Sequence, residues 1–155
     1  MAIRNMDELA TELPERAALI GLDLGSKTIG VALSDARRTI ASPKQTIRRT
    51  KFTGDAQLLE TVYREEKAAA FVIGLPVNMD GSEGPACQSA RQFAANLLTR
   101  FECTIAFWDE RLSTVAVTRS MIAADLSRKK RAERVDAAAA AYILQGAVDY
   151  LKGQS

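Results

Sequence analysis

AALIGLDLGSKTIGVALSD, residues 17–35 of the chain, contains two apolar runs separated by Gly25, Ser26 and Lys27. Two such runs joined by a short turn that contains glycine are typical of a β-hairpin. The first run is apolar at nearly every position, so we expect a central strand that is covered on both faces. Asp23 lies near its end, and a buried carboxylate needs hydrogen bonds, a cation or a metal as partner. Accepting N–H groups within the turn is the simpler structural role for Asp23.

The rest of the chain alternates between strand and helix patterns. We expect an edge strand over 37–47, where Pro43 is tolerated, buried strands over 69–73 and 104–108, and helices over 55–67, 85–100, from Ser113 or Thr114 to about 124, and 135–151. Helices separate the later strands, so these strands should pair in parallel. The predicted fold is α/β, a mixed five-stranded sheet with three antiparallel strands followed by parallel ones and with helices on both faces. Residues 1–16 are predicted to be a polar extension, and residues 17–155 to be one domain.

Length and composition narrow the class of protein. The 155 residues, of which 47% are hydrophobic and 26% charged, suit one globular domain. No apolar run approaches the roughly 18 residues that span a bilayer, so no membrane partner is expected. Residues 1–16 carry four acids and lack the apolar segment of a secretory signal. We therefore expect a cytoplasmic protein.

The chain contains no histidine. This excludes the Ser-His-Asp and Cys-His nucleophiles and the zinc sites that use histidine. Cys87 and Cys103 are too few and too far apart for a CxxC site or a disulfide framework, so we expect buried, reduced thiols. Any hydrolysis must therefore depend on carboxylates, metals, lysine or hydroxyl groups.

Positive charge is grouped along the chain, although the net charge is only +2. The groups are Arg37-Arg38, Arg48-Arg49 with Lys51, and Arg128-Lys129-Lys130-Arg131 with Arg134, all in stretches that we expect to be loops. Solvated loops often carry such runs without a ligand. Grouped basic residues also form the electrostatic surface that binds nucleic acid, and we favour this interpretation.

Three acids are expected at the same edge of the predicted sheet. Functional residues of α/β sheets collect at the carboxyl ends of strands, where Asp23 and Asp109-Glu110 lie. In the last helix, Asp136 shares an apolar face with Ala139, Ala140, Ile143 and Ala147, and this face should pack on the sheet. Stabilising the amino ends of helices is the simpler role for Glu110 and Asp136. Clustered carboxylates, however, repel one another unless cations hold them together.

Oxygen ligands alone suit Mg²⁺ or Mn²⁺ better than zinc. Two such ions about 4 Å apart would activate water and stabilise the leaving oxygen of a phosphodiester. The sequence therefore predicts a divalent-metal site at this edge of the sheet.

Four motifs resemble those of the YqgF/RuvX family and occur in that family's order. They are GLDLGSKTIGVA at 21–32, GLPVNMDG at 74–81, DERLST at 109–114 and VDAAAA at 135–140. The resemblance implies a ribonuclease H-like fold, a bacterial cytoplasmic setting and a metal-dependent nuclease. Members of the family are described as Holliday junction resolvases and as nucleases that mature the end of the small-subunit ribosomal RNA precursor. A nucleic-acid partner, either precursor ribosomal RNA or branched DNA, follows from the resemblance.

Carried over onto this chain, the resemblance places Asp23, Glu110 and Asp136 at the acidic catalytic and metal-binding positions. A related resolvase has an acid at the end of the fourth strand, where this chain has Gly74-Leu75-Pro76. The second acid is then Glu110, with Asp109 and Asp80 as alternatives. The residues assigned to phosphate contact are Lys27, Arg111, Ser113, Thr114, Arg128, Lys129, Lys130 and Arg131.

Two other functions fit parts of the sequence. The first is a non-catalytic, RNA-binding ribosome-assembly factor with the same fold. The second is ATP binding, because Asp23-Leu24-Gly25 resembles the phosphate-binding hairpin of sugar kinases and actin; those proteins use two such domains, and this chain supplies one. Symmetric resolution of a DNA junction would also require a homodimer, on which the sequence gives no information.

Overall fold

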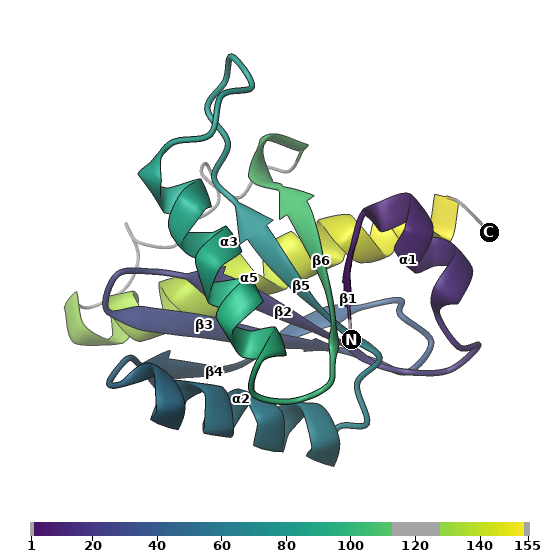
Figure 1. Cartoon of the computed structure of the whole chain (residues 1–155), viewed down its shortest axis with the longest axis horizontal. Coiled ribbons are helices and arrows are strands. Elements are labelled where there is room, and N and C mark those ends of the chain that lie inside the picture. Colours follow the sequence, from purple (N-terminus) through teal and green to yellow (C-terminus); the bar gives the residue numbers. More distant parts are fainter. Residues whose placement is uncertain (1, 113–127, 154–155) are drawn as a thin grey trace.

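The computed structural model describes residues 2–112 and 128–153, and its centre is one mixed sheet (Figure 1). The order across the sheet is β1-β6-β5-β2-β3-β4. The strands are β1 (Ala2–Arg4), β2 (Leu19–Leu24), β3 (Thr28–Ser34), β4 (Ala41–Arg48), β5 (Ala70–Leu75) and β6 (Thr104–Asp109). The helices of the described residues are α1 (Met6–Glu12), α2 (Phe52–Glu65), α3 (Pro85–Leu98) and α5 (Arg128–Gly153), and Glu110–Leu112 form the short 3₁₀ turn η1.

The hairpin and the edge strand form as the sequence predicts. β2 and β3 pair antiparallel, and β4 continues the meander at the edge. Pro43 lies opposite Ala32, beside an irregularity in the register at Val31/Ala32. Proline cannot donate to a strand ladder, so its place on the outermost strand is the one that sheet geometry allows.

The parallel half of the sheet follows from the two crossovers. β5 pairs parallel with β2 and with β6, because α2 carries the chain back from β4 to β5 and α3 carries it back from β5 to β6. Pro85 begins α3, where the missing N–H costs nothing. The carboxyl ends of β2, β5 and β6 therefore meet at the same edge of the sheet.

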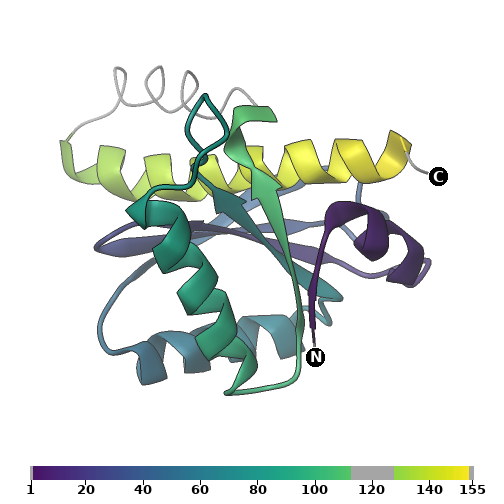
Figure 2. The same ribbon diagram turned by 45° about the horizontal axis from the view of Figure 1, so that its top comes forward.

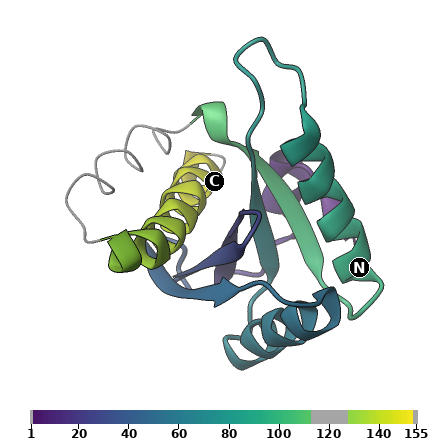
Figure 3. The same ribbon diagram turned by 90° about the vertical axis from the view of Figure 1, so that its left-hand side faces the viewer.

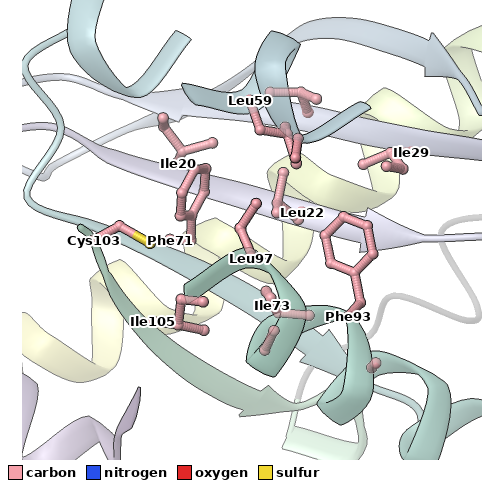
Figure 4. Packing of buried hydrophobic residues seen from close by; sticks show 14 of the residues in the cluster. Ile20, Leu22, Ile29, Leu59, Phe71, Ile73, Phe93, Leu97, Cys103 and Ile105 are labelled. Atoms are coloured by element: carbon pink, nitrogen blue, oxygen red, sulfur yellow. The ribbon is translucent and has the colours of Figure 1, made fainter. Parts of the chain in front are cut away.

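Helices cover both faces of the sheet (Figure 3). On each face, an apolar core lies between the sheet and its helices. On one face α2 and α3 cover a core that includes Ile20, Leu22, Phe71 and Ile73, all with no exposed surface (Figure 4). On the other face α5 packs with its alanines and with Ile143 and Leu144. Successive side chains along β2 and β5 thus point alternately toward α2 and α3 on one face and toward α5 on the other.

The sheet has six strands because the amino terminus contributes β1, where five strands were expected. β1 pairs parallel with β6 at the far edge, and Asn5 and Glu8 form a capping box that begins α1. Leu9 of α1 is 1% exposed, so this helix is anchored in the core beside α5. A strand of three residues is too short to produce a readable alternation of apolar residues.

The basic run 128–131 is helical, so the prediction of a loop there was wrong. α5 begins at Arg128, seven residues before the predicted start at 135. Lysine and arginine favour helices, and neither glycine nor proline interrupts residues 128–145, so the helix extends through the charged run. The helix predicted from Ser113 or Thr114 to about 124 lies outside the described residues. Within the described ranges, none of the helices is long and apolar enough to cross a membrane.

Candidate active site

Asp23 lies in the middle of the sheet, near the end of β2, and is 9% exposed. Across β3 its partner is Gly30. On the other side Leu22 pairs with Ile73 of β5, so the parallel register places Asp23 next to Gly74. Because both strand neighbours are glycines, neither adjacent strand places a side chain next to this carboxylate.

The carboxylate of Asp23 faces α5. Two residues earlier in β2, a Cβ atom on Gly21 would lie 2.7 Å from Leu144 Cβ and 2.9 Å from the Ala140 carbonyl oxygen of α5. Side chains two residues apart on a strand point to the same face. Gly21 therefore lets α5 approach β2 closely, and Asp23 shares that covered face.

Glu110 reaches the same place from β6. It begins η1, which turns the chain after Asp109, and its carboxylate lies above Gly74. A Cβ atom on Gly74 would be only 3.1 Å from Glu110 Oε2 and 2.6 Å from Ile143 Cδ1. The glycine thus leaves open the volume that the Glu110 carboxylate occupies beside Asp23. We call Asp23, Gly74 and Glu110 the carboxylate edge.

Asp109 is engaged elsewhere. Arg111 donates from Nη2 to Asp109 Oδ2 at 2.6 Å and from Nε to both carboxylate oxygens, and the Arg111 N–H donates to Oδ1 at 2.9 Å. The hydrogen bond from the Arg111 side chain holds the pKa of Asp109 below its usual range. Asp109 lines the α3 side of the sheet, together with Phe107, so it lies on the opposite face from Asp23.

Asp80 lies in the exposed loop between β5 and α3, at the top of Figure 1. Its Oδ1 accepts from the Ser82 hydroxyl at 2.6 Å and from the Ser82 N–H at 2.9 Å. These hydrogen bonds lower the pKa of Asp80. The carboxylate therefore serves the turn of this loop.

The residues assigned to phosphate contact have different surroundings. Lys27 is exposed in the β2–β3 turn, whereas Arg111 is bound to Asp109. Arg128, Lys129, Lys130 and Arg131 form the first turn of α5. Ser113 and Thr114 lie outside the described residues.

Arg49 has a structural role that its place in a charge cluster did not reveal. Its Nη1 donates to the Gly25 carbonyl at 2.6 Å, and its backbone N–H donates to the Lys27 carbonyl at 2.8 Å. The guanidinium also lies 5.5 Å from the centre of the Phe93 ring. Arg49 thus fastens the turn that follows Asp23. In the sequence Arg49 belongs to a basic group far from this turn, so the sequence does not distinguish this role from phosphate binding.

The donor set at the carboxylate edge suits a hard divalent cation, because both side chains offer only oxygen. Among the side chains that the structure describes, no three histidine, cysteine, aspartate or glutamate residues lie together as a metal site would require. Asp23 and Glu110 belong to this described set. The Asp136 side chain does not, although its backbone lies within α5.

Comparison with known proteins gives close relatives. The family model described as RuvX, Holliday junction resolvase, matches residues 17–150. A Rhizobium meliloti protein named "Putative pre-16S rRNA nuclease" is 57% identical over 97% of this chain and 92% of its own length. A Paramagnetospirillum magneticum protein of the same name is 61% identical over 94% of each chain.

Comparison of folds gives a more distant likeness. RuvC of Thermus thermophilus, in a complex with a Holliday junction substrate, matches with a TM-score of 0.54 at 8% identity, over 88% of this chain and 95% of RuvC. At this identity the match concerns the fold. The chain therefore has the α/β architecture of a ribonuclease H-like resolvase.

Proposed function

This chain belongs to the RuvX family, and from that premise we propose that it is a metal-dependent endonuclease that hydrolyses phosphodiester bonds of structured nucleic acid. One observation of the structure carries the proposal. The carboxylate of Glu110 lies over Gly74, which the strand register makes the neighbour of the buried Asp23. Two carboxylates crowded on one face repel each other, and a divalent cation between them removes that cost.

Asp136 is proposed as the third acid. In Figures 1 and 2, α5 runs from the β2–β3 turn toward α1, so its amino-terminal half lies over the hairpin. Ala140, one turn after Asp136, approaches β2 at Gly21. One helical turn advances 5.4 Å and two strand residues advance about 6.6 Å, which supports a position of residue 136 near Asp23 along the sheet. The apolar stripe of α5 passes through the same position.

Asp23, Glu110 and Asp136 would hold the metal, with Mg²⁺ as the expected ion and Mn²⁺ as a substitute. When bound, the metal supplies an activated water and stabilises the leaving oxygen of the phosphodiester. The rigid central strand fixes Asp23, and η1 fixes Glu110. Asp109 and Asp80 are less suited to this role, because Arg111 and Ser82 already engage their oxygens.

Cations around this edge would hold the nucleic-acid backbone. Lys27 is exposed at the hairpin turn, and the run Arg128–Lys129–Lys130–Arg131 begins α5 at the same end of the molecule. Arg111, Ser113 and Thr114 follow Glu110 in the chain and complete the proposed set. Contacts with phosphates would set the position of the strand without reading its sequence.

We propose precursor 16S ribosomal RNA as the substrate, because relatives 53–61% identical carry that name. The proposed setting is the cytoplasm. The test incubates the purified protein and Mg²⁺ with an RNA that spans the 5′ end of the mature 16S sequence and, separately, with a four-way DNA junction. We expect a defined cut in the RNA at a rate at least about 10-fold above that on the junction, a difference of ~1.4 kcal/mol in transition-state binding.

Junction resolution is the second candidate, and the description of the family favours it. Cutting a junction symmetrically needs two active sites, so this function requires a homodimer. Faster cleavage of the junction by a dimer, measured by sedimentation and gel analysis, would replace the RNA assignment. Tight, salt-sensitive binding of the RNA without product at any Mg²⁺ or Mn²⁺ concentration would instead identify a non-catalytic assembly factor.

A further inference from the structure

A groove of about 420 Å³ lies on the α3 side of the sheet, opposite the face that carries Asp23. The α3–β6 groove is lined by Leu75, Val77 and Phe107 along the strands, by Glu83 and Arg91 at α3, by Ile3–Met6 at the β1–α1 junction, and by Gly81, Asp109 and Arg111 at its upper rim. This volume lies within the range of about 300–1,000 Å³ for small-ligand sites. The proposed catalytic residues leave this groove unused.

Two planar groups meet inside the groove. The Arg91 guanidinium lies over the Phe107 ring, 5.0 Å from its centre. Glu83 fixes the plane of the guanidinium, since its two oxygens accept from Nε and Nη2 at 2.7 Å each. The Arg91 side chain is 44% exposed, so part of it is accessible to a ligand.

The charges of the groove are already neutralised. Arg91 pairs with Glu83, Arg111 with Asp109, and Arg4 with Glu12. Inside the groove, Arg4 and Arg91 are each held in an ion pair and therefore offer a phosphate little unpaired positive charge. A guanidinium plane held beside an aromatic ring instead suits stacking on a nucleobase.

The groove adjoins the carboxylate edge. Leu75 follows Gly74 in β5, and Asp109, the last residue of β6, precedes Glu110. Leu75 and Asp109 line the groove, whereas Gly74 and Glu110 belong to the carboxylate edge on the other face. A strand bound at the carboxylate edge therefore reaches the groove by passing over the ends of β5 and β6. This path is accessible to a single strand, whereas a base inside a duplex stays stacked and paired.

We propose that the α3–β6 groove binds an unpaired nucleobase close to the cleaved phosphate, stacked on the Arg91 guanidinium that Phe107 supports from its other side, so that the enzyme selects strands that are single-stranded beside the cut. This inference rests on the proposed nuclease function and adds the class of substrate. The enzyme then recognises a single-stranded segment of the nucleic acid next to the cleaved bond.

The test uses an RNA duplex with a single-stranded 5′ tail, in which 2-aminopurine replaces one tail base at a time, and a fully paired duplex of equal length. Binding is measured in EDTA, so that cleavage does not contribute. The variants are Arg91→Gln and Phe107→Leu, which keep most of the packing volume. Arg64→Gln is the matched control, because Arg64 is also an exposed helical arginine paired with a glutamate.

Stacking should quench 2-aminopurine at one tail position in the wild type. Each groove variant should weaken binding of the tailed duplex about 10-fold, the effect of one lost base stack, and leave the paired duplex and the control unchanged. Absence of quenching at every position would overturn the proposal, as would equal losses on both duplexes or wild-type binding by both variants. Cleavage of the tailed RNA by the wild type, assayed separately with Mg²⁺, reports on the nuclease function itself.

Discussion

Replacing Asp23 with asparagine is expected to reduce metal-dependent cleavage by more than about 10³-fold, because the central ligand loses its charge while its shape is kept. Asp23 is 9% exposed, and its neighbours on β3 and β5 are glycines, so neither adjacent strand supplies a carboxylate in its place. The fold should stay intact, since asparagine has the same shape as aspartate.

The measurement is the single-turnover rate with saturating Mg²⁺, together with circular dichroism of the folded protein. Asp149→Asn provides the matched control, because Asp149 is exposed on α5 and accepts a hydrogen bond from Gln145. The control should cleave at the wild-type rate. Cleavage by the Asp23 variant within tenfold of wild type would show that Asp23 is not at the reacting centre.

Gly74→Ala is expected to lower kcat/KM by about 10–100-fold and to reduce the free energy of unfolding by about 1–3 kcal/mol. The added methyl would lie 2.6 Å from Ile143 Cδ1 and 3.1 Å from Glu110 Oε2, so both must move. The first contact explains the loss of stability, and the second explains the loss of activity.

A second substitution separates the two effects. Ile143→Val removes the Cδ1 atom, so the double variant should regain stability relative to Gly74→Ala while its activity stays low. Gly54→Ala is the control, since its nearest heavy atom beyond its own helix backbone would be Thr50 Oγ1 at 3.6 Å and alanine favours helices by about 0.5–1 kcal/mol. If the double variant regained both activity and stability, the loss of activity in Gly74→Ala would not come from the displaced Glu110 carboxylate, and Glu110 would not be needed for catalysis.

The place of Asp23 could be predicted from sequence because it depends on local patterns. An apolar run that contains one acid and is followed by a turn with glycine is typical of a central strand in a hairpin. The sheet with helices on both faces also followed, since the order of strands and helices determines which strands pair in parallel. The structure confirmed both.

The choice among Asp80, Asp109 and Glu110 could not be made from sequence. It depends on which face each side chain occupies after β6 turns into η1, and on the ion pair between Arg111 and Asp109. Neither feature produces a periodic pattern of residues in the sequence. The glycine at position 74 marked a departure from a related resolvase. Only the structure shows that the Glu110 carboxylate lies where a side chain at position 74 would be.

The basic run at 128–131 shows a different limit. Charge grouping favoured a loop, whereas helix propensity favoured continuation of α5, and the structure follows propensity. The pattern of the last helix still placed Asp136 correctly within α5. Its part in the site remains a prediction.

Binding of Mn²⁺, followed by electron paramagnetic resonance of the free ion, tests the central claim that Asp23, Glu110 and Asp136 share divalent metal. We compare the wild type with Asp136→Asn, and Asp149→Asn again provides the control. Loss of one of three carboxylate ligands should weaken Mn²⁺ binding by about 10-fold or more, while the control keeps the wild-type affinity. An unchanged affinity in Asp136→Asn, with the fold intact, would contradict the account.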